Sequence, residues 1–389
     1  MTSARVEISP LHATTREIEP PADLLEHLGA GGFAWFGNEV SFVTGGVAAT
    51  LDPGDAAAFL AAVEHHSPAD APRPAGPIAV GALPFAAAGR LVVPARVIGI
   101  DRAGRAWSTR VAHGVATRAE AVPQAVGYSV EAVSTIDAWQ RAVGRVLHAV
   151  GRGDVTKVVL AREVGVEADR PFDIARVLRE LRRTQPGCFV FADDGFVGAT
   201  PELLVRRTGD VVTCRPMAGT VARGADASSL VASRKDGAEH DAVASAVVTE
   251  LRRWCSDVIA AEAVPAEFAD VTHLVTHVEA RLHDDATNAL DLARALHPTP
   301  AVAGTPRNAA LAMIRSLEPT DRGKYAGPVG WVAPNGDGEF AVALRCAQID
   351  GSHARLHAGA GIVAGSDAVA EWDETSAKFE PMLRALVRP

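Results

Sequence analysis

The pattern of apolar and polar positions changes near residue 130. Before this point, short apolar segments such as "GGFAWFG", "SFVTGGVAATL", "GPIAVGALPF" and "RLVVPARVIGI" are separated by Gly and Pro, a pattern that predicts strands joined by turns. Residues 67–77, "SPADAPRPAGP", have the composition of a surface loop. The first third of the chain, residues 1–130, is therefore predicted to consist of short strands.

Helical periodicity begins at about residue 136. Apolar residues recur at helical spacing in "TIDAWQRAVGRVLHAVGRGDV" and stop at a glycine. Further helices are predicted over "FDIARVLRELRRTQPG", over "EHDAVASAVVTELRRWCSDVIAA", over residues 290–296 and 307–317, and from near Glu371. The segments predicted as strands between them are "KVVLAREVGVEA", "CFVFADD", "GFVGAT", "ELLVRRTGDVVTCRP", "GPVGWVAPNG", "EFAVALRCAQID" and "ARLHAGAGIVAG". Strands and helices mixed without regular βαβ alternation predict an α+β fold in a single large domain, 1–389.

Composition and charge exclude several classes of protein. Hydrophobic residues make up 48% and charged residues 22% of the 389, which is typical of a globular protein with a sizeable core. The formal net charge is −9 with dispersed basic residues, which argues against nucleic acid as a partner. The sequence contains no run of 18 apolar residues, so no membrane span is predicted. The four cysteines lack CxxC spacing, so neither a zinc site nor a disulfide framework is predicted, and the first residues lack the layout of a signal peptide. We expect a cytoplasmic protein.

Isolated carboxylates in apolar surroundings are the first candidates for chemistry. Glu202 stands in "FVGATPELLV", Glu239 opens a long helix, and Glu371 and Glu374 share one face of the last helix. Acids at helix starts commonly stabilise the helix dipole without any ligand. Alternatively, glutamates from two helix starts converge on Mg²⁺, which prefers hard oxygen ligands. Spacing alone leaves both interpretations open.

Lys157, in "DVTKVVLARE", enters an apolar strand. One interpretation is a side chain that reaches solvent at the sheet edge. If the lysine is instead desolvated in a pocket, its pKa falls and it is suited to act as a general base. An apolar setting raises the pKa of Glu202, which then suits a general acid.

The glycine-rich segment "HAGAGIVAG" does not fit a dinucleotide-binding motif, because its third glycine is displaced and no early βαβ unit accompanies it. Closely spaced glycines do expose backbone amides that bind carboxylates. Arg345 lies on the preceding strand segment, so the two together are a candidate carboxylate-binding pair.

Taken in order, several motifs make the chain resemble the chorismate-utilising enzyme family, which includes isochorismate synthases, salicylate synthases and the large subunits of anthranilate and aminodeoxychorismate synthases. The resemblance runs from about residue 131 to 389, and residues 1–130 match only loosely through "FAWFG" and "GALPF". The motifs that carry it are "KVVLAR", "FVGATPELLV", "RPMAGTVARG", "EHDAVASAVV", "HPTPAVAGTPR", "GPVGW", "VALRCAQI", "AGAGIVAGS" and "EWDETSAKF".

This resemblance implies two stacked, mostly antiparallel β-sheets flanked by helices, a bound Mg²⁺ and chorismate as substrate. It assigns Lys157 as the base that activates water and Glu202 as the acid. Direct Mg²⁺ ligands are Glu239 and Glu374, while Glu371 and Asp236 hold the waters of the ion. The implied substrate contacts are Gly219, Thr220, Ala301, Tyr325, Arg345, Gly361 and Lys378.

Within the family, a lysine at position 157 favours water as the nucleophile and therefore an isochorismate synthase. Ala301 and Val302 follow that pattern, whereas Tyr325 also occurs in members that eliminate pyruvate, so salicylate synthase is the alternative. A non-catalytic chorismate-binding subunit is the alternative of another class. The resemblance implies neither a glutaminase subunit nor an oligomer, and the sequence leaves open whether the product serves siderophore, menaquinone or salicylate-derived metabolism.

Overall fold

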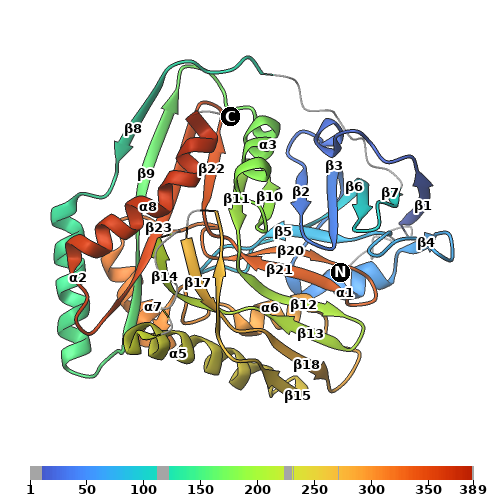
Figure 1. Cartoon of the computed structure of the whole chain (residues 1–389). Helices are drawn as coiled ribbons and strands as arrows, with labels where there is room; N and C mark the ends of the chain where they lie inside the picture. Colours follow the sequence, from blue (N-terminus) through green and yellow to red (C-terminus); the bar gives the residue numbers. More distant parts are fainter. Residues whose placement is uncertain (1–10, 112–121, 223–229, 231, 270, 388–389) are drawn as a thin grey trace, which may run out of the picture.

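A computed structural model describes residues 11–111, 122–222, 230, 232–269 and 271–387 of the chain (Figure 1). The helices are η1 (Leu24–His27), η2 (Pro53–Asp55), α1 (Ala56–Ala61), α2 (Ile136–Gly151), α3 (Ile174–Thr184), α5 (Arg234–Leu251), α6 (Ala289–Leu296), α7 (Arg307–Leu317) and α8 (Ala368–Val387). The strands up to residue 168 are β1 (His12–Ile18), β2 (Phe33–Phe36), β3 (Val40–Leu51), β4 (Glu64–His66), β5 (Ala79–Ala82), β6 (Leu91–Asp101), β7 (Ala106–Val111), β8 (Tyr128–Ala132) and β9 (Lys157–Ala168). The later strands are β10 (Phe189–Asp193), β11 (Phe196–Thr200), β12 (Leu203–Thr208), β13 (Val211–Cys214), β14 (Met217–Ala222), β15 (Cys255–Ala260), β16 (Val264–Glu267), β17 (Val271–Val275), β18 (Val278–Leu282), β19 (Gly304–Thr305), β20 (Pro328–Val332), β21 (Gly338–Val342), β22 (Cys346–Asp350) and β23 (His353–Val363).

A long antiparallel ladder joins the two parts of the chain. Its order is β8–β9–β23–β22–β11–β10–β2–β3–β6–β7–β1, and β4 pairs in parallel with β1 at its end. The two parts meet where β10 pairs with β2, with Val190 opposite Phe36. In Figure 1 the blue N-terminal strands therefore continue the sheet that contains the green β10 and β11.

A second ladder, β5–β20–β21–β12–β13–β18–β15, starts beside the first residues of β6. The two ladders pack face to face. Trp35 on β2 donates a hydrogen bond from Nε1 to Oε1 of Glu339 on β21 at 3.0 Å. The ring of Phe42 on β3 meets Trp331 on β20 edge-on, with centroids 6.3 Å apart. The predicted α+β fold with two stacked, mostly antiparallel sheets is confirmed.

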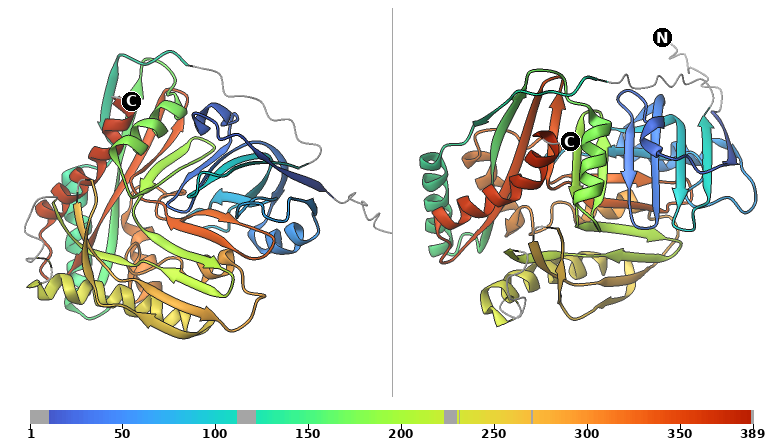
Figure 2. Two further views of the ribbon diagram at one scale, coloured as in Figure 1. Left: turned by 45° about the vertical axis from the view of Figure 1, so that its right-hand side comes forward. Right: turned by 45° about the horizontal axis from the view of Figure 1, so that its top comes forward.

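Helices cover the outer faces, and a small third sheet, β14–β17–β16, stands apart from the two ladders. α8 packs against β23, α2 and α3, and it crosses β9 and β23 in the views of Figure 1 and Figure 2. α5 packs against β14. The main core cluster contains side chains from Ala13 to Ile362, so both parts of the chain share one core. The division predicted near residue 130 stays a prediction. Among the described residues, no helix combines the length and apolarity needed to cross a membrane.

Three predicted segments are wrong in part. The strand predicted over "ELLVRRTGDVVTCRP" is a hairpin of two strands, β12 and β13. The helix predicted over "EHDAVASAVVTELRRWCSDVIAA" ends at Leu251, and Cys255–Ala260 forms β15 because it pairs with β18. The strand predicted over "EFAVALRCAQID" is broken into β21 and β22. The break falls at Arg345, whose φ of 47° is incompatible with an extended strand.

The last helix begins slightly earlier than predicted. α8 starts at Ala368 rather than near Glu371. Asp367 precedes it, and its Oδ1 accepts hydrogen bonds from the backbone N–H groups of Val369 and Ala370, as an N-cap residue does. Trp139 of α2 donates from Nε1 to the carbonyl of Ala368 at 2.9 Å, which fixes the start of the helix against α2.

Candidate active site

A cavity of about 130 Å³ lies among β9, β23, α5, α8 and the small sheet. Most residues that the sequence predicts for the site line it. They are Lys157, Glu202, Gly219, Glu239, Ala301, Arg345, Gly361, Glu371, Glu374 and Lys378. These side chains come from segments far apart in the chain, so tertiary structure alone brings them together.

Lys157 begins β9 and is buried, with 6% of its surface exposed. The interpretation that it reaches solvent at a sheet edge is therefore wrong. β9 pairs with β23 so that Val159 lies opposite Gly361. A Cβ atom on Gly361 would lie 2.7 Å from Cε of Lys157, which is too close for two carbon atoms. Glycine at position 361 thus leaves the space that the lysine side chain occupies.

The ammonium group of Lys157 pairs with Glu239 of α5. Nζ lies 2.7 Å from Oε1, and the two side chains are 7% and 18% exposed. Removing one partner of a buried pair strongly destabilises the folded protein, because the other charge is left uncompensated. The candidate base and a candidate metal ligand therefore share one hydrogen bond.

Glu202 lies between β11 and β12 and is 5% exposed. Its backbone is held by Val342, which donates to the Glu202 carbonyl at 3.0 Å. Burial raises the pKa of the Glu202 carboxyl to about 8, although the nearby charges of Lys157 and Arg345 act in the opposite direction. The carboxyl group is accordingly protonated at neutral pH, as a general acid must be.

Arg345 reaches the cavity from the break between β21 and β22. Its left-handed backbone, with φ of 47°, is unusual for a residue with a side chain. The Arg345 carbonyl accepts a hydrogen bond from the backbone N–H of Ala199 at 3.1 Å, which helps to hold this conformation. Strained backbone held by its surroundings is a feature of functional sites.

α8 contributes Glu371, Glu374 and Lys378 to the cavity. Lys378 donates from Nζ to Oε1 of Glu374 at 2.5 Å and to the carbonyl of Gly359 on β23 at 2.9 Å. The predicted salt bridge along the helix is thus present, and the same lysine also ties α8 to β23. Glu371 is 8% exposed.

The donor set at this cavity consists of carboxylate oxygens, the ligands that Mg²⁺ prefers. Glu239, Glu371 and Glu374 all line the cavity, and Glu239 and Glu374 each pair with a lysine. Among the described side chains, no three His, Cys, Asp or Glu residues are grouped closely enough to hold an ion in this arrangement. The residues fit the chemistry of a magnesium site, and the two ion pairs compete with a metal for the same oxygens.

His273 of β17 also lines the cavity and was missed in the sequence. Its Nδ1 lies 3.1 Å from the carbonyl of Gly219 on β14. Burial, and then the charge of Arg345, lower the pKa of His273 to about 3, so the imidazole is neutral at neutral pH. A histidine inside the apolar strand "VTHLV" is the signal that was available in the sequence.

Among the predicted site residues whose side chains the structure describes, Tyr325 does not line the small cavity. Tyr325 is buried behind it, with its ring stacked on His357 at 5.5 Å. Its hydroxyl points toward β23, since a Cβ on Gly359 would lie 3.1 Å from Oη. The side chains of Thr220 and Asp236 lie outside the described residues.

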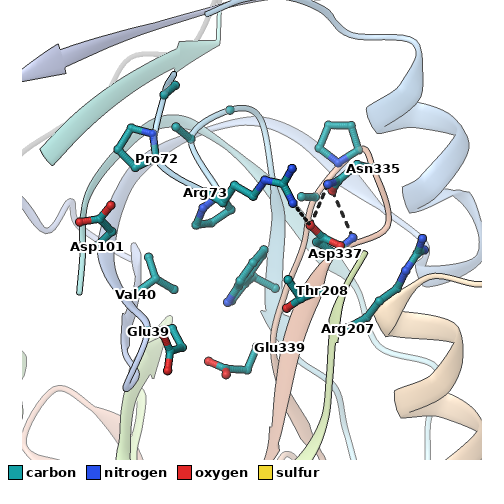
Figure 3. Close-up of a pocket in the computed structure, with 18 of the residues that line it drawn as sticks. Glu39, Val40, Pro72, Arg73, Asp101, Arg207, Thr208, Asn335, Asp337 and Glu339 are labelled. Atoms are coloured by element: carbon teal, nitrogen blue, oxygen red, sulfur yellow. Dashed lines mark hydrogen bonds and ion pairs between the residues drawn. The ribbon is translucent and has the colours of Figure 1, made fainter. Parts of the chain in front are cut away.

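A much larger cavity, of about 980 Å³, lies at the opposite end of the stacked sheets. Loop 67–77 and the β12–β13 and β20–β21 hairpins line it, and Figure 3 shows part of this lining. Asp337 accepts from the amide of Asn335 at 2.8 Å and lies 3.8 Å from Arg73. None of the residues that the sequence predicts for the site lines this cavity.

Comparison with known proteins identifies the family of this chain. A family model described as chorismate binding enzyme matches residues 102–387. The isochorismate synthase DhbC of Bacillus subtilis (strain 168) is 37% identical over 332 residues, which cover 80% of this chain and 81% of that protein. The structure of MenF, the menaquinone-specific isochorismate synthase of Escherichia coli, has a TM-score of 0.85 at 25% identity and covers 97% of this chain and 95% of that one.

The fold is shared more widely. Anthranilate synthase component I from Streptococcus pneumoniae TIGR4 has a TM-score of 0.68 at 21% identity, with 98% of this chain and 94% of that chain covered. The chain belongs to the family of chorismate binding enzymes.

Proposed function

We propose that this protein is an isochorismate synthase. The observation that carries the proposal is the convergence of a buried lysine and a protonated carboxyl group on one cavity. Lys157 enters from β9 and Glu202 from the β11–β12 junction. The similarity to isochorismate synthases, in sequence and in fold, supports the same function.

The proposed reaction needs a base and an acid on one substrate. Lys157 takes a proton from a water molecule as the water oxygen bonds to C2 of chorismate. The ring double bonds shift, and the bond from C4 to its hydroxyl breaks. Glu202 donates its proton to the departing hydroxyl, which leaves as water, so the product is an isomer of the substrate. Positioned groups of this kind typically contribute about 10²–10⁴-fold each to the rate.

The pair between Lys157 and Glu239 must open before the lysine can accept a proton. A base must contact the water molecule that it deprotonates, and Nζ of Lys157 is held by Oε1 of Glu239 at 2.7 Å. A cation held by Glu239 would use the same carboxylate. We therefore propose that Lys157 becomes a base only when Glu239 has another partner.

Mg²⁺ is the proposed partner, with Glu239 and Glu374 as direct ligands and Glu371 and Asp236 as contacts through water. When bound, the ion would neutralise a substrate carboxylate and polarise the conjugated ring. The remaining substrate contacts are expected from Arg345, the Gly361 amide, Lys378, Ala301, Tyr325, Gly219 and Thr220. A guanidinium group suits this role because it binds a carboxylate through two parallel hydrogen bonds.

The similarity to single-chain isochorismate synthases fits the expectation that no glutaminase subunit is needed. Salicylate synthase remains the second candidate, because Tyr325 resembles the residue of members that eliminate pyruvate. The arrangement of Lys157 and Glu202 argues against a non-catalytic subunit, since both side chains line the cavity.

Product analysis tests this proposal directly. Purified protein is incubated with chorismate and Mg²⁺, and the products are separated by chromatography. We expect isochorismate without salicylate. Pyruvate in equal amount to the consumed chorismate would identify a salicylate synthase instead, and unchanged chorismate would favour a binding subunit.

A further inference from the structure

We propose that Arg162 is a positioning residue that sets the rotation of α8 about its axis, and thereby the placement of Glu371, Glu374 and Lys378. This inference rests on the proposed function only for the role of the three cavity side chains. Its structural part concerns a buried cation, the last residue of "KVVLAR", for which the resemblance implies no role.

Arg162 lies in the middle of β9, five residues after Lys157. Successive side chains of a strand point to opposite faces, so Arg162 leaves β9 on the face opposite to Lys157. It is 4% exposed. Burial lowers its pKa to about 10, although the charge of Asp373 acts in the opposite direction. No carboxylate of the described residues lies within 4.0 Å of its nitrogen atoms as an ion-pair partner. A buried cation without an ion-pair partner is costly unless its hydrogen bonds are satisfied.

The partners that satisfy Arg162 belong to α8. Nε of Arg162 donates to Oγ1 of Thr375 at 2.6 Å. Nη2 donates to the carbonyl of Trp372 at 3.2 Å and to Oγ of Ser376. The guanidinium carbon lies 3.7 Å from the centre of the Trp372 ring and 4.9 Å from that of Phe379. One guanidinium group is thus held by hydrogen bonds and two rings from one helix.

These contacts determine how α8 faces the cavity. Residues 372, 375, 376 and 379 occupy one side of the helix, and residues 371, 374 and 378 occupy the adjacent side, because each residue advances the helix by about 100°. Packing of apolar side chains is non-directional. A planar guanidinium with fixed donor directions is directional. Arg162 therefore fixes the angle of α8, while the contact between Trp139 and Ala368 fixes its start.

The test compares Arg162→Lys with Arg207→Lys. Arg207 is a matched control, because it is equally buried at 4% and donates to the carbonyls of Gly209, Asp285 and Thr287. It lines the large cavity rather than the small one. Both variants are expected to lower the unfolding temperature, since each lysine replaces a planar fork by a single donor group.

Only Arg162→Lys is expected to raise the KM for chorismate and the Mg²⁺ concentration for half-maximal rate, each by about 10-fold, because small misplacements of binding groups are costly. The kcat at saturating chorismate and Mg²⁺ is expected to stay within about 3-fold, since neither Lys157 nor Glu202 belongs to α8. If Arg162 had only a structural role, the Arg162→Lys variant would be less stable, but its KM and Mg²⁺ requirement would not rise at an unchanged kcat.

Thr375→Val provides a second variant in case the first folds poorly. It removes the Thr375 hydroxyl that accepts a hydrogen bond from Nε of Arg162. The Mg²⁺ concentration for half-maximal rate is expected to rise, as in Arg162→Lys. In the double variant the two shifts are expected to be less than additive, because both residues act through one contact.

Calorimetric titration of Mg²⁺ without chorismate separates this inference from the proposed function. Weakened Mg²⁺ binding in Arg162→Lys supports positioning even if the wild-type protein does not form isochorismate. Equal shifts in Arg162→Lys and Arg207→Lys, or unchanged KM and Mg²⁺ binding in a folded Arg162→Lys variant, would overturn the inference.

Discussion

The two cavities of this protein differ in size and in chemistry. The large one, about 980 Å³, opens between loops and hairpins at one end of the stacked sheets (Figure 3). The small one, about 130 Å³, lies between β9, β23 and α8 and is lined by the proposed base, acid and metal ligands. If volume alone identified the active site, the large cavity would be chosen.

The charges of the two cavities are arranged differently. In the large cavity, exposed arginines pair with nearby acids, as Arg73 does with Asp337 and Arg102 does with Glu39, and both arginine side chains are 77% exposed. In the pair of Arg102 and Glu39 both side chains are exposed, and exposed pairs contribute little free energy. In the small cavity, by contrast, the pKa of Glu202 is raised to about 8 by burial. Because burial also raises the pKa of Glu339 at the large cavity, the shift at Glu202 locates the chemistry only together with the lysines, Arg345 and the glutamates that line the same small cavity.

Removing one cation from each cavity provides the sharpest test of this contrast. Lys157→Ala is expected to lower kcat/KM by about 10²–10⁴-fold, because it removes the proposed base. Arg206→Ala in the large cavity removes the partner of the buried Glu339. It is expected to lower stability while kcat/KM of the folded protein stays within about 3-fold. Steady-state kinetics and thermal unfolding measure both. Full activity of Lys157→Ala would remove the lysine from the mechanism.

Two buried glutamates allow a comparison of equal residue types. Glu202→Gln is expected to lower kcat by about 10²-fold or more, because the amide cannot supply the proton. Glu339 is 1% exposed, and burial also raises its pKa, yet Glu339→Gln is expected to leave kcat within about 3-fold. Loss of kcat in both variants, measured at equal folded fraction, would show that the contrast between the cavities is wrong.

The raised pKa of Glu202 predicts how stability and kcat depend on pH. Its pKa is about 8 in the folded protein and near 4.5 ordinarily. The folded state therefore binds the proton more tightly, and the contribution of this group to stability is lost as pH rises from about 4.5 through about 8. We expect kcat to fall above about pH 8. Urea unfolding at about pH 5 and pH 8 should show a weaker loss of stability for Glu202→Gln than for the wild type.

A smaller effect is expected for single carboxylates at the proposed metal site. Glu374→Gln should raise the Mg²⁺ concentration for half-maximal rate by about 10-fold, because one ligand loses its charge. Glu39→Gln, at the mouth of the large cavity where the side chain is 52% exposed, should leave the Mg²⁺ titration unchanged. Identical titrations for Glu374→Gln and the wild type would exclude Glu374 as a ligand.

Much of the fold was predictable because local patterns agree with it. The helix over residues 307–317 and the strand that begins at Lys157 follow from periodicity. The strand break at Arg345 was not predictable, because a left-handed backbone at a non-glycine residue leaves no trace in the apolar pattern. β15 was missed because it is defined by pairing with β18, a strand that begins only at Val278 and that no local pattern links to it.

The residues that carry the candidate chemistry could be named without the structure. Motifs identified nearly all of the ionisable residues that line the small cavity. They missed His273, whose imidazole also lines it. How these residues act on one another follows only from the tertiary structure. Lys157 pairs with Glu239 rather than with solvent, and Glu202 holds its proton because the fold buries it. Both properties depend on charges and burial contributed by distant segments, and such long-range interactions are set by packing rather than by neighbouring residues.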